Sequence, residues 1–489
     1  MSTSRRRFLQ VASAGGAIAG VAGFSALSKA LAPLLTGPGD GLAPFQAPTG
    51  EAISQEIHVL NRLSFGPRPG DLEKIRKIGI RGWIDRQLRP EEIDDNWTEA
   101  RTRHFEALHV WPLGELLEYN ADELLDQMTR DKILRATHSN RQLQEVMVDF
   151  WTDHFNIDPS KGDSKWLKPA DDRTVIRRHA LGNFRDLTAA SAKSPSMLWY
   201  LDGRLNRRAS GAGKPNENYA RELLELHTLG VNGGYTQRDV MEVARCLTGW
   251  TVRARKDSRF AVGKVAFKAS LHDDGAKTLL GESIPAGLGA ADLDRVLDIV
   301  CNHPSTARHL AEKLCRRFIS DEPPETAVAI TEKAFTDSGG DIRKTLSALF
   351  SSGEFLGSRG TKVKRPFHFV ISTLRATAGR TDAGPAIQDY LVRMGHAPFQ
   401  YPTPDGYPEE AQPWMATLLW RWKFALDFAN RSLKGTRYPQ EKLAEMAGED
   451  DALAAHFLGR LPTALETRAL AGSGNPTALL LACPAFQIF

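Results

Sequence analysis

A histidine and a glutamate share the helix predicted between Pro215 and Gly230, and their side chains could carry acid–base chemistry. At about 100° per residue, His227 falls inside the apolar face that contains Leu223, and Glu222 lies on the border of that face. Imidazole and carboxyl groups are frequent general acids and bases in enzymes. Polar groups directed into a protein interior also need partners, so this helix is where a functional site is expected first.

A second helix, predicted over residues 140–156, repeats the pattern with His154 in the middle of its apolar face. One hypothesis is that His154 and His227, with Glu222 or Asp158, form a metal or acid–base site. The alternative is a pair of core histidines bonded to backbone carbonyls. The sequence contains no H-E-x-x-H or comparable metal-ligand spacing.

Other polar and aromatic residues near helix starts and in compact loops could contact a substrate. His272 is a further catalytic candidate, within a short polar motif that also contains Lys277. The predicted substrate-binding residues are Asn218, Arg221, Lys277, Asp405 and Trp414. The alternatives are that Arg221 pairs with a glutamate four residues away on a solvated face, and that the loops are turns held by local hydrogen bonds.

The loop from Asp202 to Pro215 suggests a third chemistry, the capture of an anion. It contains three arginines and a lysine and leads into a helix start, where free backbone N–H groups attract negative charge. A sulfate, phosphate or uronate group would suit such a loop. The alternative is an ordinary solvated surface loop.

Helical patterns dominate the chain and predict a mostly α fold. A long charged run over 113–135 is predicted as one helix, and Thr236 and Asp239 have the spacing of a capping box at the start of another. Alternating segments within 251–285 predict a minor β element. Pro and Gly gather over 379–413, which predicts a long structured loop.

The N-terminus matches a twin-arginine export signal. Residues 4–10 read S-R-R-R-F-L-Q, and an Ala- and Gly-rich apolar run follows to about Leu35. The expected organisation is a signal segment over 1–36, a linker over 37–50, a main α-helical domain over 51–378, and a Pro/Gly-rich loop with a C-terminal helical subdomain over 379–489. The twin-arginine translocase is then a partner, and the protein is periplasmic or extracellular. Cleavage of the segment and its retention as a membrane anchor both stay open.

Composition excludes some functions. The net charge of +4 comes from 63 basic and 59 acidic residues, and residues 1–32 hold four basic residues and no acidic one. Without that segment the charge is zero, so no nucleic-acid partner is expected. The four cysteines match no zinc spacing and are expected to be buried free thiols, with disulfides as the alternative. No cofactor can be identified, although a metal ion stays open.

Several strings of the sequence carry a family resemblance. They include NENYARELLELHTLGVNGGYTQRDVMEVARCLTGW, HVLNRLSFGPRPGDL, VMVDFWTDHFNI, HPSTARHLAEKLCRRFISDEPP, PTPDGYP and CPAFQ. From about His58 to the C-terminus the chain resembles the bacterial family called domain of unknown function 1800. The resemblance implies a mostly helical, secreted protein without an established activity. It also implies a neighbouring gene for an exported protein similar to sulfatases.

Together these patterns favour an exported hydrolase or lyase acting on a polymeric glycan or anionic substrate. Glu222 and His227 are the expected acid and base, His154 and His272 would support them, and Arg221 would position the substrate. One alternative is a non-catalytic assembly or binding partner of the co-encoded sulfatase-like protein. Another is a metal-dependent oxidoreductase.

Overall fold

The computed structural model of the protein describes residues 42–209, 213–253, 261–448 and 450–489. Helices make up most of this part of the chain, and the strands within it form only two-stranded antiparallel pairs. The mostly α fold with a minor β element is therefore confirmed. The predicted export signal lies outside the described residues.

In the first part of the described chain, helices are connected by loops and turns, and no strand is present. Its helices are α3 (Gln55–Arg62), α4 (Asp71–Gln87), α5 (Asn96–Thr102), α6 (Glu106–His109), α7 (Leu113–Leu116), α8 (Ala121–His138), α9 (Gln142–His154), α10 (Ser164–Asp171), the π-helix η2 (Asp172–Arg177), α11 (Phe184–Ala192) and α12 (Pro195–Tyr200).

The middle part adds two hairpins to the helices. Its elements are α13 (Asn218–Glu222), the π-helix η4 (Leu223–His227), α14 (Gln237–Cys246), β1 (Trp250–Val252), β2 (Val265–Phe267), β3 (Lys277–Leu279), β4 (Glu282–Ile284), α15 (Ala291–Cys301), α16 (Pro304–Phe318), α17 (Glu325–Asp337), α18 (Ile342–Phe350), α19 (Gly353–Gly357) and α20 (Pro366–Ala376). β1 pairs with β2 and β3 with β4.

The last part holds shorter helices and one further strand pair. Its elements are β5 (Arg380–Thr381), α21 (Pro385–Arg393), the 3-10 helix η6 (Gln412–Thr417), α22 (Leu418–Ala429), β6 (Thr436–Arg437), α23 (Gln440–Ala447), α24 (Asp450–Leu458), α25 (Ala464–Ala471), α26 (Pro476–Ala482) and α27 (Pro484–Gln487). β5 pairs with β6.

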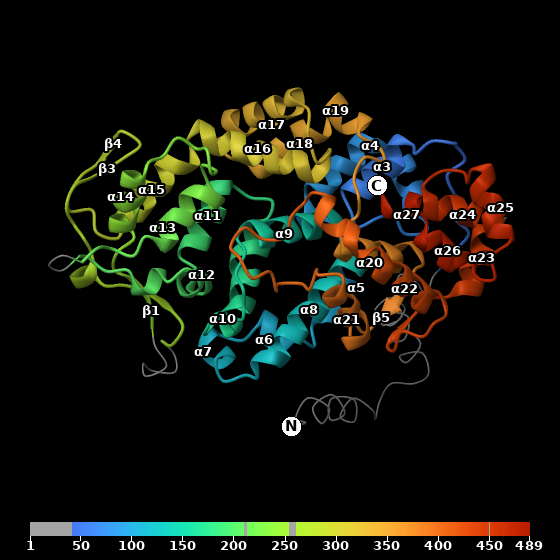
Figure 1. The fold of residues 1–489 in the computed structure, drawn as a ribbon, viewed down its shortest axis with the longest axis horizontal. Helices are drawn as coiled ribbons and strands as arrows, with labels where there is room; N and C mark the ends of the chain where they lie inside the picture. The colour runs from blue at the N-terminus through green and yellow to red at the C-terminus, as the bar shows by residue number, and fades with distance from the viewer. Residues whose placement is uncertain (1–41, 210–212, 254–260, 449) are drawn as a thin grey trace, which may run out of the picture.

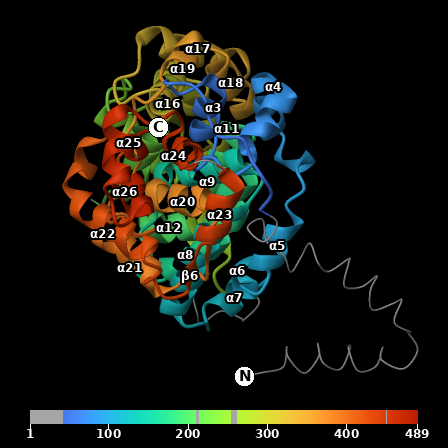
Figure 2. The ribbon, with the colours of Figure 1, turned by 90° about the vertical axis from the view of Figure 1, so that its right-hand side faces the viewer.

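The molecule is elongated, with α8 and α9 near its centre (Figure 1). Helices α13 to α15 lie at one end, α16 to α18 run across the top, and α22 to α26 form the other end. The C-terminal helices cover the face seen in Figure 2. Residues near both ends of the described chain meet, because the Arg62 guanidinium lies 4.5 Å from the centroid of the Phe489 ring.

The predicted boundaries are partly right. The capping box at Thr236 and Asp239 is present at the start of α14, and both hairpins fall where a β element is predicted. The single helix predicted over 113–135 is wrong: α7 ends at Leu116, and α8 begins after Asn120, whose side chain accepts hydrogen bonds from two backbone N–H groups. The pair β5–β6 is not predicted, since two-residue strands leave no alternating pattern.

Two properties of the described residues bear on function. All four cysteines are free, and three of them are buried. In the same part of the chain, no helix combines the length and the apolar character needed to cross a membrane. The predicted division into a main domain and a C-terminal subdomain stays a prediction.

Candidate acid–base site

The loop over 401–408 reaches from the C-terminal part of the chain to α9, as the orange segment in Figure 1 shows. The Asn156 amide, just after α9, donates to two carbonyls of this loop at 2.9 and 2.7 Å, and the Tyr200 hydroxyl donates to a third at 3.0 Å. Gly406 has a φ of +74°, and a Cβ there would lie 2.1 Å from the Asp153 carbonyl oxygen. The loop therefore needs glycine at this position to approach α9 so closely.

A buried ionic network fixes the elements around this loop. Asp149 of α9 forms ion pairs with Lys132 of α8 at 2.8 Å, with Arg317 of α16 at 3.2 Å, and with Arg365, the residue before α20. Glu409, just after the loop, pairs with Arg317 at 3.1 Å and with Arg365 at 3.4 Å. Burial alone would raise the pKa of Asp149, but the three cations hold it well below its usual value.

Glu222, the last residue of α13, is partly buried and has no hydrogen-bond or ion-pair partner among the described residues. Its pKa is raised, first by burial, then by the charge of Glu225, and also by Asp405 of the loop. Glu225 differs, because its carboxylate accepts a hydrogen bond from the Tyr235 hydroxyl at 3.3 Å. Glu222 is thus partly buried, as its border position in the sequence pattern predicts, and its catalytic role stays a prediction.

Lys313 on α16 is the residue that the sequence prediction missed. It is partly buried, and within the described chain no carboxylate oxygen lies within 4 Å of its amine. Burial lowers its pKa to about 8, although the charges of Asp153, Glu409 and Asp405 act in the opposite direction. Asp405, itself exposed, therefore acts electrostatically on both Lys313 and Glu222. The spacing of His309 and Lys313, four residues apart on one helix face, is the signal that could have found it.

The predicted catalytic histidines lie in the interior beside this site. His154 and His227 are 1% and 0% exposed, and their ring centroids are 6.1 Å apart. His154 Nε2 lies 3.1 Å from the His227 carbonyl oxygen, the bond expected of a core histidine. His309 adds a third ring, 6.4 Å from His154. Burial lowers the pKa of His227 to about 3 and that of His309 to about 4, so both rings are neutral.

A metal centre does not emerge from these residues. In the described ranges, no three His, Cys, Asp or Glu side chains lie where they could hold a metal ion together. His154 and His227 thus lack a third side-chain ligand there, and three or four protein ligands are usual for zinc. His227 and His154 are also sealed from solvent, so neither can touch a substrate in this conformation.

His272 and Lys277 belong to a different cluster. His272 Nε2 lies 3.1 Å from a carboxylate oxygen of Asp292 on α15, and the Lys277 amine donates to the same carboxylate and to the Asp273 carbonyl. Both side chains are almost completely buried. These contacts anchor β3 to α15, and they leave neither residue free to bind a substrate.

The remaining predicted binding residues are also held in place. Arg221 donates to Glu217 at 3.0 Å and to Gln237 at 2.7 Å, which is the surface pairing expected as its alternative. Asn218 donates to a backbone carbonyl at 3.1 Å. Trp414 is buried, and its indole N–H donates to the Pro408 carbonyl at 3.2 Å, so it supports the loop from behind.

The loop over 202–215, predicted to capture an anion, is only partly described, because residues 210–212 lie outside the described ranges. The Arg204 guanidinium lies 3.9 Å from the centroid of the Trp199 ring. A cation above an aromatic face is a stable arrangement without an anion.

Comparison with known proteins adds the family. No curated protein and no solved structure matches the chain. The family model described as "Protein of unknown function (DUF1800)" matches residues 58–488, a range that includes Glu222, Lys313 and Asp405. Because the match covers most of the chain, the chain belongs to the DUF1800 family.

Proposed function

We propose that the protein is an exported hydrolase or lyase that acts on a polymeric glycan or other anionic polymer. The observation that carries this proposal is that the pKa of Glu222 is raised and that of Lys313 lowered, while the charge of Asp405 acts on both groups. Both are partly buried next to the 401–408 loop, and neither is neutralised by an ion pair among the described residues. The twin-arginine pattern at the N-terminus supports export.

The chemistry assigns a base and an acid. Glu222, with its raised pKa, accepts a proton from water in a hydrolysis or from carbon in an elimination. Lys313, still an ammonium below pH 8, donates a proton to the leaving oxygen. Asp405 is exposed, its charge acts on both groups, and it orients substrate hydroxyls. His227 loses the acid role assigned to it from sequence, because its ring is sealed from solvent.

The test is a screen of the secreted protein on neutral, uronate-containing and sulfated polysaccharides. New reducing ends indicate cleavage, and absorbance of an unsaturated product distinguishes a lyase from a hydrolase. We expect E222Q and K313M to lose at least about 100-fold in rate, the usual contribution of a general acid or base.

The matched controls are E225Q, three residues from Glu222, and K333M on the exposed surface of α17. Both controls should keep most of the activity. Full activity in E222Q or K313M would defeat the assignment, and so would a wild-type protein that cleaves none of the polymers.

A second candidate function, assembly with the co-encoded sulfatase-like protein, is favoured by an exposed apolar stripe. Met415, Leu419, Trp422 and Leu426 lie on one face of η6 and α22 and are 51%, 68%, 52% and 49% exposed. Contiguous apolar surface of this kind commonly marks a protein-binding face. Co-purification should fail for L419E/W422E and persist for L465E, which changes an isolated exposed leucine.

A further inference from the structure

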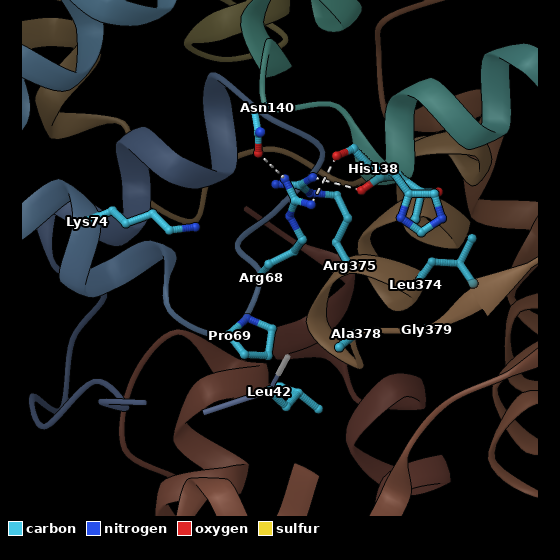
Figure 3. Close-up of a pocket in the computed structure, with 11 residues that line it drawn as sticks. Leu42, Arg68, Pro69, Lys74, His138, Asn140, Leu374, Arg375, Ala378 and Gly379 are labelled. Atoms are coloured by element: carbon cyan, nitrogen blue, oxygen red, sulfur yellow. Dashed lines mark hydrogen bonds between the residues drawn. The ribbon is translucent and has the colours of Figure 1, made fainter. Parts of the chain in front are cut away.

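A small cavity between α4, the α8–α9 turn and α20 concentrates positive charge. It has a volume of about 100 Å³, and its polar lining comes from Arg68, Lys74, His138, Asn140 and Arg375. Figure 3 shows the Lys74 amino group directed toward the two arginines. The rest of the lining is Thr137, apolar side chains and the backbone turn that follows α20.

The cations in this cavity outnumber the anions. The one carboxylate that pairs with them in the described structure is Asp71. Its oxygens lie 2.9 Å from the Lys74 amine, 3.4 Å from Arg375 Nη2 and 4.0 Å from Arg68 Nε. Arg68 also donates to two carbonyls at the end of α8, at 3.0 and 3.1 Å. Arg375 donates to a third carbonyl there, at 3.0 Å. A helix C-terminus contributes about half a negative charge, so more than one positive charge stays uncompensated.

Three buried polar atoms of the lining also lack hydrogen-bond partners among the described residues, and Thr137 Oγ1 is one of them. His138 is 6% exposed, and its Nε2 has no hydrogen-bond partner among the described residues; Arg68 Nε is likewise buried and makes no hydrogen bond there. Buried donors are satisfied in nearly all folded proteins. Their nitrogens therefore indicate an acceptor that the polypeptide itself does not provide.

The arginines are costly to hold here without an anion. Burial, and then the charge of Arg68, lowers the pKa of Arg375 well below its usual value despite Asp71. A guanidinium nevertheless stays protonated in proteins, so its charge persists at a free-energy cost. Burial, and then the charges of Arg101, Arg68 and Arg375, lower the pKa of His138 well below its usual value, so its ring is neutral and has one N–H donor.

We propose that this cavity binds a tetrahedral oxyanion, a sulfate or phosphate group, between Arg68, Arg375, Lys74 and His138. Four oxygens can accept donors that arrive from different sides, whereas a carboxylate offers two oxygens in one plane. Arginine forks bind such groups through paired hydrogen bonds. The volume equals that of roughly three liquid water molecules, which suits one such group.

The test measures binding of inorganic sulfate and inorganic phosphate to the full-length protein by titration calorimetry, with chloride keeping the ionic strength constant. Thermal unfolding in the same salts is a second readout. Sulfate and phosphate stabilise proteins generally by exclusion from their surface, so the comparison between variants isolates the site.

The matched pair is K74Q and K77Q, two lysines of α4 of which only Lys74 lines the cavity. K74Q should weaken sulfate binding by about 2- to 5-fold, as expected for one partly exposed charge, and K77Q should leave it unchanged. R68Q should weaken it by about 10-fold or more. If R68Q does not fold, the comparison of K74Q with K77Q still tests the proposal.

A sulfated monosaccharide, compared with inorganic sulfate, distinguishes the two sources of the group. Tighter binding of the sugar assigns the cavity to a sulfate ester, and tighter binding of the free ion assigns it to an inorganic anion. Absence of saturable binding of sulfate and phosphate, or equal affinities in K74Q and K77Q, would overturn the proposal.

Discussion

At the scale of single residues, the function proposed here depends on two side chains whose pKa values move toward neutrality from opposite directions. Burial raises the pKa of Glu222 and lowers that of Lys313. Enzymes that run acid–base chemistry near pH 7 adjust their catalytic groups in this way. The charge of the exposed Asp405 adds to the rise in the pKa of Glu222 and opposes the fall in that of Lys313.

Lys313 should therefore react as an amine at a lower pH than most lysines do. We expect the rate of its acetylation, followed by mass spectrometry of the folded protein, to reach half its maximum at about pH 8. The acetylation rate of Lys333 on α17 is the reference for a solvent-exposed lysine. A Lys313 that reaches half-maximal reactivity only above pH 10 would contradict the assignment as an acid near neutral pH.

The sequence identified part of this site and missed the rest for physical reasons. Helical periodicity alone placed Glu222 at the border of an apolar face and His227 inside it, and both positions are as expected. Lys313 could not be ranked above other lysines, because its burial and its carboxylate neighbours come from α9 and the 401–408 loop. Arg68 and Arg375 both approach Asp71 although they are far apart in the sequence, and no local pattern reports this.

At the scale of elements, the site depends on how the 401–408 loop meets α9. The loop has few contacts of its own and is fixed by Asn156, Tyr200 and the close approach at Gly406. The ionic network around Asp149 then joins α8, α9, α16 and α20. Most of this arrangement uses backbone carbonyls and long-range ion pairs, which the Pro- and Gly-rich composition of the segment does not specify.

Gly406→Ala should destabilise the protein more than the backbone strain of a positive φ alone would. The reference is Gly395→Ala, because Gly395 has a similar φ of +70° but no atom within 4 Å of its Cβ position. We expect G395A to cost on the order of 1 kcal/mol in unfolding free energy and G406A about 1–3 kcal/mol more. Urea unfolding measures both, and equal losses would show that the loop does not need this close contact.

Asp149→Asn should be among the most destabilising conservative changes in the chain. It leaves Lys132, Arg317 and Arg365 buried with less negative charge, and removing one partner of a buried network costs about 3–5 kcal/mol. The exposed Asp294, which pairs with Lys193, is the control, and D294N should cost less than about 1 kcal/mol. Similar losses in both variants would mean that the network contributes little.

At the scale of the whole molecule, several buried histidines make stability depend on pH. Burial lowers the pKa to about 3 for His58 and His227 and to about 4 for His309. Below pH 6.5 the unfolded chain binds protons at these residues and the folded protein does not, so protonation favours unfolding. The stability that these residues contribute is present above pH 6.5 and is lost as the pH falls toward 4.

The free energy of unfolding should therefore fall between pH 6.5 and pH 4, with a slope of up to about 1.4 kcal/mol per pH unit for each such histidine. Urea unfolding at a series of pH values gives the slope. H58Q should reduce this slope by the contribution of one histidine. An unfolding free energy that stays constant from pH 7.5 to pH 5 would show that these rings accept protons in the folded state.

The ionic network also has a consequence for how the chain folds. Its partners are far apart in sequence, with 168 residues between Arg317 and Asp149 and 216 between Arg365 and Asp149. Contacts of such separation form late, because closing long loops costs entropy before it is repaid. Until then the same charges stay hydrated, which keeps a half-assembled core soluble. On the twin-arginine export route proposed above, that late closure would determine when the chain is ready to leave the cytoplasm.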